Sequence, residues 1–407
     1  MKLLIILKSG VPYELKSGGQ QAVYHMINYI RHRIDISLLF PYQGDDNQKR
    51  VNELQSNWAN VDFFIFKEKH FNKDNIFKKI IIKIFKKIFN NNILDNQLFN
   101  FDIPNAEYLE YINYVIIKKK IDIVQTEFFT TINLIYSLPK YVKKVFVNHE
   151  IRFERIKQVL ENSKEVTSID IYKYNKTKSD EISAMQKYDA IITLSNIDRE
   201  KIIKEGISSD KIFSSPIGIP NTEIDFTFIH KPNTLSFLGG SGHPPNVNGI
   251  TWFLENIWGK ILEQESDFRL NVIGKWSPIC KNKFSKYRNV NFLGIVENLS
   301  EVLPRTIMII PILIGSGVRI KAMEGINAGC SIVSTSVGIE GLNFKSGRDC
   351  FIEDEPDLFA KRILELNNNW SLQETFVKNA QEWYNNQYSI EKLGSERISI
   401  YEKIMER

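Results

Sequence analysis

The chain has 407 residues, of which 43% are apolar, 25% charged and 12% aromatic, and its formal net charge is +5. This balance excludes a disordered, collagen-like or coiled-coil protein, and the length predicts two domains of about 200 residues. Three cysteines without metal-ligand spacing exclude a disulfide scaffold and a structural zinc site, and they indicate a reducing cytoplasm.

Short runs rich in Ile, Val, Leu and Phe alternate with amphipathic stretches, a pattern that predicts βα units around parallel sheets. The first run, at 3–7, is too short for the apolar core of a signal peptide, and no run reaches the ~18 residues of a membrane span. Each half of the chain contains enough runs for its own doubly wound sheet. Further strands are expected at 34–39, 61–66, 121–125, 143–147 and 189–194, and then at 234–238, 269–273, 289–293, 306–310 and 331–335.

A segment rich in Ser, Pro and Gly, Ser214–Pro220, interrupts the strand and helix patterns and predicts a domain boundary. An ordinary surface loop within one large sheet is the alternative. Since open α/β sheets bind ligands beyond the carboxyl ends of their strands, two facing sheets would define one cleft. We expect a first domain at 1–215, a linker at 216–233, a second domain at 234–385 and a C-terminal helix at 386–407.

Residues 74–92, DNIFKKIIIKIFKKIFNNN, predict an amphipathic helix with Ile and Phe on one broad face. The first 220 residues carry a formal charge of +7, and the remainder carries −2. Such a helix can lie in an anionic membrane interface, whereas the alternative is a core-packed helix with a solvated basic face. Nucleic acid is not an expected partner. The lysines opposite the apolar face are Lys79, Lys83, Lys86 and Lys87.

Two glycine-containing turns precede predicted helices and are candidate anion sites. Gly18 and Gly19 follow the first strand and precede a helix expected at 20–32. The second turn, Gly315-Ser316-Gly317, follows the strand at 306–310. Glycines allow a ligand close to the backbone, and N–H groups at a helix start favour negative charge. Plain tight turns are the alternative at both places.

The helix after the second turn begins near Val318 and carries three charged residues. Arg319 and Lys321 can neutralise a phosphate, and Glu324 can accept hydrogen bonds from a ribose diol. The alternative is a capped helix whose charged side chains face solvent.

Two histidines lie where predicted strands end. His149 follows the strand at 143–147, and His243 closes the Gly-Gly-Ser-Gly turn after the strand at 234–238. Histidine at such a position can hydrogen-bond a reacting sugar, although a structural histidine is the alternative.

The second half resembles the donor-binding domain of GT-B glycosyltransferases, specifically the retaining family 4. The resemblance covers most of 234–345, whereas the first half matches more loosely through Gly18-Gly19, Asp122–Val124, His149 and Asp189–Ser195. The matching stretches of the second half are Phe237–Gly240, Pro245-Asn246, Trp252-Phe253, Leu270–Gly274, Val290–Gly294, Pro311–Lys321, Glu324, Ala328-Gly329, Val333–Thr335 and Gly338–Leu342.

The resemblance implies the GT-B fold: two Rossmann-like doubly wound domains facing each other across a cleft, with the C-terminal helix crossing back to the first. It further implies retaining, metal-independent transfer of a sugar from a nucleotide-diphosphate sugar, with no cofactor. The expected acceptor is a glycan, lipid-linked, in bacterial surface polysaccharide synthesis. With the basic helix, this predicts a cytoplasmic protein peripheral to the inner face of the plasma membrane.

The resemblance also assigns site residues. Family members usually carry two glutamates seven residues apart; Glu324 matches the second, and Ser316 stands in place of the first. The basic residues common after the first strand of the donor domain are absent here, which shifts diphosphate neutralisation to Arg319, with Lys321 second. The implied catalytic residues are His149, Glu324 and Arg319, and the implied donor-binding residues are Gly18, Gly19, Gly240, Lys275, Gly294, Ser316, Gly317, Val318 and Lys321.

Two alternatives remain. A nucleotide-sugar epimerase has the same two-sheet architecture without an external acceptor. A catalytically silent partner in a glycosyltransferase complex is compatible with Ser316 in place of the glutamate.

Overall fold

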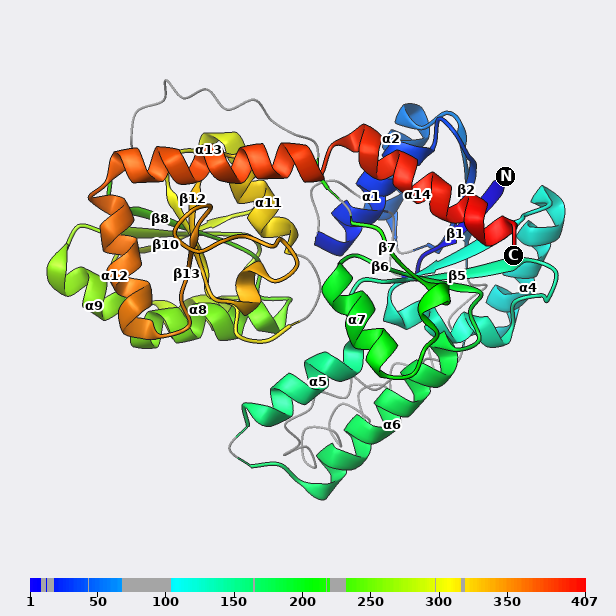
Figure 1. The fold of residues 1–407 in the computed structure, drawn as a ribbon, viewed down its shortest axis with the longest axis horizontal. Coiled ribbons are helices and arrows are strands. Elements are labelled where there is room, and N and C mark those ends of the chain that lie inside the picture. Colours follow the sequence, from blue (N-terminus) through cyan, green and yellow to red (C-terminus); the bar gives the residue numbers. More distant parts are fainter. Residues whose placement is uncertain are drawn as a thin grey trace. The chain divides into compact units, whose positions relative to one another are not determined.

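A computed structural model of the chain describes residues 1–8, 12, 18–42, 44–67, 104–163, 165–216, 218–219, 232–296, 298–315 and 319–407 (Figure 1). The chain divides into two compact units. The first unit contains Met1–Tyr13, Met26–Ser215 and Gly394–Arg407, and the second contains Glu14–His25 and Pro216–Leu393. The predicted basic helix at 74–92 and the turn residues Ser316, Gly317 and Val318 lie outside the described residues.

The first unit is built on a parallel sheet with the strand order β3-β2-β1-β4-β5-β6-β7. Its predicted strands are confirmed, with ends that differ by up to two residues. The short strand β7, which pairs with β6, was not predicted. The strands are β1 (Lys2–Ile6), β2 (Asp35–Pro41), β3 (Val61–Phe66), β4 (Ile123–Glu127), β5 (Lys143–Asn148), β6 (Ala190–Thr193) and β7 (Ile212–Ser214).

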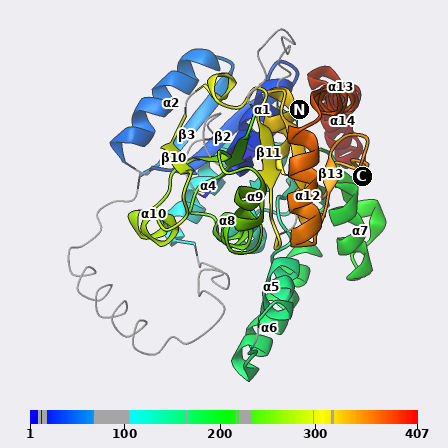
Figure 2. The same cartoon turned by 90° about the vertical axis from the view of Figure 1, so that its left-hand side faces the viewer.

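Side-chain caps define several helix starts in the first unit. Asn105 accepts a hydrogen bond from the backbone N–H of Glu107 at the start of α4, and Thr167 forms a capping box with Asp170 at the start of α6. Helices α5 and α6 lie side by side (Figures 1 and 2). The helices are α1 (Gly18–Ile30), which continues from the second unit, α2 (Asp45–Asn57), α4 (Ala106–Lys119), η2 (Phe129–Tyr136), α5 (Arg152–Glu161), α6 (Ser168–Met185), α7 (Asn196–Lys204), η3 (Ser209–Lys211) and α14 (Ile390–Met405).

The second unit contains a parallel sheet with the order β10-β9-β8-β11-β12-β13. Its predicted strands are again confirmed, and β13, which is two residues long, was not predicted. With the first sheet, it confirms the predicted pair of doubly wound parallel sheets. The strands are β8 (Thr234–Leu238), β9 (Arg269–Ile273), β10 (Val290–Gly294), β11 (Ile307–Ile310), β12 (Ser331–Ser334) and β13 (Phe351–Ile352).

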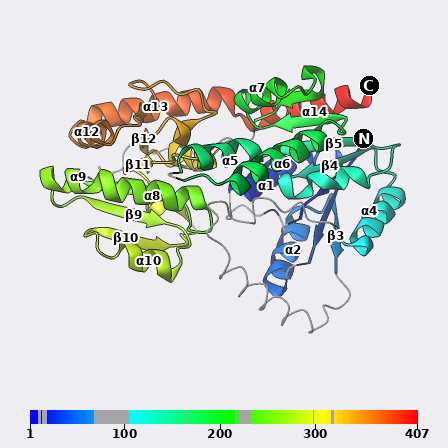
Figure 3. The same cartoon turned by 90° about the horizontal axis from the view of Figure 1, so that it is seen from below.

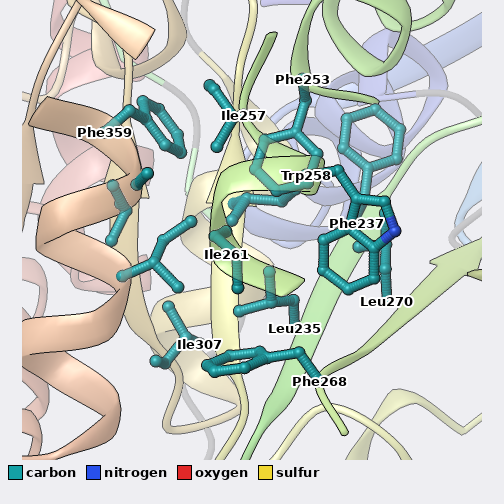
Figure 4. Packing of buried hydrophobic residues seen from close by; sticks show 14 of the residues in the cluster. Leu235, Phe237, Phe253, Ile257, Trp258, Ile261, Phe268, Leu270, Ile307 and Phe359 are labelled. Carbon is teal, nitrogen blue, oxygen red and sulfur yellow. The ribbon is translucent and has the colours of Figure 1, made fainter. Parts of the chain in front are cut away.

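Helices cover both faces of the second sheet, with α8 and α9 on one side and α11 and α13 on the other (Figure 1). Phe253 and Trp258 pack with strand residues such as Phe237 in one buried cluster (Figure 4). Helix α10 lies beside the edge strand β10 (Figures 2 and 3). The helices are α8 (Pro244–Asn256), α9 (Trp258–Gln264), α10 (Pro278–Phe284), η4 (Leu299–Glu301), α11 (Ile320–Asn327), η5 (Val337–Ile339), α12 (Pro356–Asn367) and α13 (Trp370–Gln387).

The division between Ser215 and Pro216 coincides with the expected end of the first domain, whereas Glu14–His25 and 386–393 group with the second unit. Glu14–His25, which includes the start of α1, groups with the second unit, because a Cβ on Gly18 would lie 3.2 Å from the Ile320 side chain and Gln21 bonds to Glu324. The C-terminal segment returns to the first unit only from Gly394. Among the described helices, none has the length and apolarity needed to cross a membrane.

Candidate functional site

The turn from β8 to α8 forms one side of a polar cluster in the second unit. A Cβ on Gly240 would lie 2.9 Å from the Lys275 carbonyl oxygen, so only glycine fits this approach of two backbones. Asn246, in the first turn of α8, donates from Nδ2 to the Gly240 carbonyl at 3.0 Å. Its Oδ1 accepts from Lys321 Nζ at 2.6 Å. The turn therefore fixes the amide that holds Lys321.

Helix α11 supplies the charged side chains of this cluster. The Lys321 ammonium lies 5.0 Å from the centre of the buried Phe237 ring of β8. One turn further along α11, Glu324 Oε1 accepts a hydrogen bond from Gln21 Nε2 of α1 at 3.0 Å. Arg319 occupies the N-cap position of α11. Three segments distant in the sequence thus meet at the start of α11.

Burial changes the proton affinity of both charged groups. The pKa of Lys321 is lowered to about 7, first by burial and then by the nearby Arg319 charge, while Glu324 opposes the shift. The pKa of Glu324 is raised to about 6 by burial, against the opposing effects of Gln21 and Lys321. Between about pH 6 and about pH 7, Lys321 is therefore a cation and Glu324 an anion. Because the two groups interact, a charged ligand bound beside them changes the protonation of both.

The helices of the second unit differ in whether a side chain caps their start. Side-chain caps are absent at the starts of α8, α9, α11 and α12, and α8 begins with two prolines, which have no N–H. By contrast, Ser277 caps α10 and Asn369 caps α13 with side-chain hydrogen bonds. Of the uncapped starts, that of α11 lies at this cluster and is not formed by proline, so an anionic ligand's oxygens can accept from its first backbone N–H groups.

A second polar cluster lies in the first unit, around His149. His149 Nε2 lies 2.6 Å from Glu127 Oε2, and the Glu127 side chain is fully buried. Both residues stand where strands end, Glu127 as the last residue of β4 and His149 just after β5. The Phe128 ring stacks on the imidazole with a centroid distance of 4.0 Å. The imidazole is therefore held at one edge and on one face.

The structure brings several predicted site residues together. Gly18 packs on the first residue of α11, and Gly240 meets the Lys275 backbone beside the amide that holds Lys321. The Lys275 side chain is exposed. Gly294 ends β10, and its carbonyl accepts from the Gly274 N–H at 2.7 Å. Gly19 is the second residue of α1.

Other predicted residues are not placed in this cluster. His149 belongs to the first unit, and His243 is exposed at the N-cap of α8. Ser316, Gly317, Val318, Lys79, Lys83, Lys86 and Lys87 lie outside the described residues.

Sequence reasoning missed three residues that hold the predicted ones: Gln21, Asn246 and Glu127. Gln21 is nearly fully buried, and a polar residue within the apolar pattern of a predicted helix was the available signal. Asn246 carries part of the resemblance but was given no role in the site. Among the described residues, no group of three or more His, Cys, Asp and Glu side chains is arranged to hold a metal ion.

Comparison with known proteins gives a family match within the second unit. Residues 232–369 match the model of a family described as Glycosyl transferases group 1. A Klebsiella pneumoniae protein described as "Uncharacterized 44.6 kDa protein in cps region" is 26% identical over 176 residues. The match covers 41% of this chain and 45% of that protein, so it spans less than half of this curated relative.

Solved structures match almost the whole chain. A mutant of S. aureus TarM in complex with Fondaparinux, alpha-GlcNAc-glycerol and UDP is 12% identical, with a TM-score of 0.66 and coverage of 98% of this chain and 99% of that one. The lipopolysaccharide outer core galactosyltransferase WaaB in its apo form is 12% identical, with a TM-score of 0.58 and coverage of 99% and 100%. At such low identity this similarity establishes the fold alone.

The class defined by this fold is GT-B, with two parallel-sheet α/β domains and a helical C-terminus. Within this fold, the match to the family of group 1 glycosyl transferases lies in the second unit, at residues 232–369.

Proposed function

We propose that this protein is a glycosyltransferase that moves a sugar from a nucleotide-diphosphate sugar to a glycan acceptor in the synthesis of a cell-surface polysaccharide. The observation that carries the proposal is the cluster of Lys321, Asn246 and Glu324 at the start of α11, inside the family-matched segment. The printed names of two similar proteins, "cps region" and "lipopolysaccharide outer core galactosyltransferase", support the polysaccharide context.

The start of α11 is assigned to the diphosphate of the donor. A diphosphate carries about two negative charges at neutral pH and needs cations or N–H donors where charge develops as it leaves. Lys321, held by Asn246, and Arg319, at the N-cap, supply the cations. The absence of a side-chain cap at α11 adds backbone N–H donors to the same place, whereas α8 begins with two prolines that have no N–H.

Glu324 is assigned to the ribose. Gln21 donates to Oε1 and fixes the carboxyl group, so Oε2 is the atom we assign to the ribose hydroxyls. His149, oriented by Glu127, is assigned to a hydrogen bond with the transferred sugar. These roles follow the family resemblance and use the contacts described above.

Transfer proceeds in this proposal with retention of the anomeric configuration and without a metal ion. The departing diphosphate oxygen takes the proton of the acceptor hydroxyl, and Arg319 and Lys321 stabilise the leaving group in place of a divalent cation. Chelation with EDTA is expected to leave the rate unchanged. Loss of activity that Mg²⁺ or Mn²⁺ restores would contradict this part of the proposal.

The acceptor is proposed to be lipid-linked, with the protein on the inner face of the plasma membrane. This rests on the sequence of 74–92 alone, whose lysines and apolar residues suit an anionic lipid surface. Replacement of Lys79, Lys83, Lys86 and Lys87 by glutamate is expected to abolish co-sedimentation with vesicles containing phosphatidylglycerol. Unchanged sedimentation would exclude this segment as the anchor.

The central test is transfer of radiolabelled sugar from a panel of nucleotide sugars, with Glu324→Gln and Arg319→Met compared with wild type. Both variants are expected to lose roughly 100-fold in rate or more, because each removes a charged group at the leaving group or ribose. Glu263→Gln and Arg269→Met, at exposed positions of the same unit, are the matched controls.

The same assay separates the alternatives. Conversion of the donor sugar without an acceptor would indicate an epimerase. Failure of every nucleotide sugar to stabilise the protein against heat would indicate a catalytically silent partner. Full activity in both Glu324→Gln and Arg319→Met would refute the site assignment.

A further inference from the structure

A chain of buried hydrogen bonds lies behind His149 in the first unit. Glu127 Oε2 is 2.6 Å from His149 Nε2, and Glu127 Oε1 accepts from Gln125 Nε2 at 2.5 Å. Gln125 Oε1 in turn accepts from the Tyr401 hydroxyl at 2.5 Å. Gln125, Glu127 and Tyr401 all have no exposed surface. The chain thus links the C-terminal helix α14 to the imidazole through two side chains of β4.

The sheet itself sets this arrangement. Gln125 and Glu127 are two residues apart on β4, so their side chains share one face of the strand. Glu127 pairs with Val147 of the parallel neighbour β5, which brings the next polar residue after that strand, His149, to the same edge. Phe128, the residue that follows Glu127, has a positive φ of 69° and stacks on the imidazole. A bulky residue rarely adopts this backbone conformation.

Each hydrogen bond in the chain has a defined direction. An ionised Glu127 only accepts, so the Gln125 amide presents its NH₂ group to the carboxylate and its oxygen to the Tyr401 hydroxyl. His149 must likewise place its proton on Nε2, facing Glu127. The neutral imidazole then has an unprotonated Nδ1 that can accept a hydrogen bond. All donors point toward Glu127, which strengthens the individual bonds.

We propose that Glu127 is the positioning residue that fixes His149 in its Nε2–H tautomer and so presents the Nδ1 lone pair to a hydroxyl of the donor sugar. Tyr401, through Gln125, holds the Glu127 carboxylate in the orientation this requires. The part that concerns the sugar rests on the proposed function, whereas the tautomer and its dependence on Glu127 and Tyr401 do not.

The role of α14 follows from where it is fixed. Arg397 is buried and donates from Nε to Ser215 Oγ at 2.7 Å and from Nη2 to the Ser215 carbonyl at 3.2 Å. Tyr401 lies one turn further along α14, so its hydroxyl has a fixed place over β4. Helix α14 therefore contributes to the first unit's polar cluster through the hydroxyl of the fully buried Tyr401.

The test uses the full chain labelled with ¹⁵N at histidine, read by long-range ¹H–¹⁵N spectra of the imidazoles. A His149→Gln variant identifies the His149 signals among those of the six histidines. In the wild type, His149 is expected to show the pattern of a single Nε2–H tautomer with a downfield proton from the short hydrogen bond. In Glu127→Gln, both tautomers are expected, because the amide can accept from or donate to Nε2. Glu127→Asp keeps the charge and is expected to restore part of the Nε2–H signal.

Tyr401→Phe removes one hydroxyl and is expected to move the His149 proton upfield without loss of the fold, as thermal unfolding checks. Its matched control is Tyr188→Phe, which removes a buried hydroxyl bonded to Thr126 Oγ1 at 2.9 Å and the Ile132 carbonyl at 2.8 Å. That control is expected to leave the His149 signals unchanged. A single Nε2–H tautomer in Glu127→Gln, or equal effects of Tyr401→Phe and Tyr188→Phe, would overturn the proposal.

Kinetics extend the test to catalysis. Glu127→Gln is expected to lower kcat for sugar transfer by roughly 30-fold, the scale of one hydrogen bond lost in a buried site, and to change KM for the donor little. A tautomer shift without any change in kcat would overturn the role in transfer. A wild type that shows the single tautomer but transfers no sugar would refute the proposed function while supporting the role of Glu127 toward His149.

Discussion

Helix α5 in the first unit and helix α11 in the second both begin beyond the strand ends of their own sheet. They differ in whether a side chain accepts hydrogen bonds from their first backbone N–H groups. At α5, the buried Glu181 of α6 accepts from the N–H groups of Arg152 at 3.1 Å and Phe153 at 3.0 Å. At α11, no side-chain cap is present, and the charged residues lie on the helix itself. The first unit thus satisfies the start of α5 with its own carboxyl group, whereas the start of α11 in the second unit has no side-chain cap.

The largest expected effect comes from removing the cation at α11. Lys321→Met is expected to weaken UDP binding by roughly 100-fold in isothermal titration, because a charged donor to the diphosphate is lost. UDP is the nucleotide in the TarM complex. Lys361→Met, at an exposed position of α12 in the same unit, is the control and is expected to bind UDP like the wild type.

The pH dependence of UDP binding follows from the same residue. With a pKa lowered to about 7 by burial, Lys321 is a cation below that pH and neutral above it. Wild-type affinity is therefore expected to fall by roughly tenfold per pH unit above this value. An identical fall in Lys321→Met would show that another group is responsible.

The next effect concerns the packing that holds α8, and with it Asn246, against the end of β11. A Cβ on Gly249 would lie 2.4 Å from the Pro311 carbonyl oxygen, a backbone atom that cannot move aside cheaply. Gly249→Ala is expected to lower the free energy of unfolding by about 2 kcal/mol in urea denaturation. Gly259→Ala in α9 has open space around the new methyl group and is expected to stabilise by about 0.5 kcal/mol. Equal effects of the two substitutions would contradict the close packing.

The carboxyl group at α5 gives a pH dependence of stability. Burial raises the pKa of Glu181 to about 8 from 4.5, so the folded state keeps a proton that the unfolded chain has released. The contribution of this proton to the free energy of unfolding is complete below pH 4.5 and is lost as the pH rises to about 8. Its slope is about 1.4 kcal/mol per pH unit. Glu181→Gln is expected to lose this slope in urea unfolding at pH 6 and 7, and parallel profiles for the two proteins would contradict the assignment.

The smallest effect tests an ordinary capped helix of the first unit. Thr167→Ala is expected to lower the free energy of unfolding by about 1 kcal/mol, because the capping box of α6 is lost. Its neighbour Ser168→Ala, at an exposed position, is expected to change the free energy by less than about 0.5 kcal/mol. A large loss from Ser168→Ala would mean that α6 is held at its start by other contacts.

Most of the fold could be predicted from sequence because most of the strands are short segments rich in Ile, Val, Leu and Phe, separated by amphipathic stretches. β7 and β13 were missed because three and two residues are too few to give a pattern. The strand expected at 121–125 is instead β4, at Ile123–Glu127, because buried polar residues extend it beyond its apolar part. That shift explains why Glu127 was not recognised beside His149.

The charged residues of the candidate site could be predicted from the sequence, but the residues that hydrogen-bond to them could not. Lys321 and Glu324 follow a glycine turn and appear in a local pattern. Their partners Asn246 and Gln21 are 75 and 303 residues away in sequence, so only the folded chain brings them near. The same holds for Tyr401, which is 276 residues from Gln125.

The division of the chain has a consequence for any attempt to study the halves in isolation. A fragment ending at Ser215 would contain His149 and Glu127 but not Tyr401, and a fragment starting at Pro216 would contain Glu324 but not Gln21. Each recombinant half would thus lack one hydrogen-bonding residue of its own polar cluster. Donor-binding or spectroscopic data from such fragments would describe incomplete clusters. A fragment that contains all of the second unit needs residues 14–25 as well, supplied as a peptide or fused by a linker.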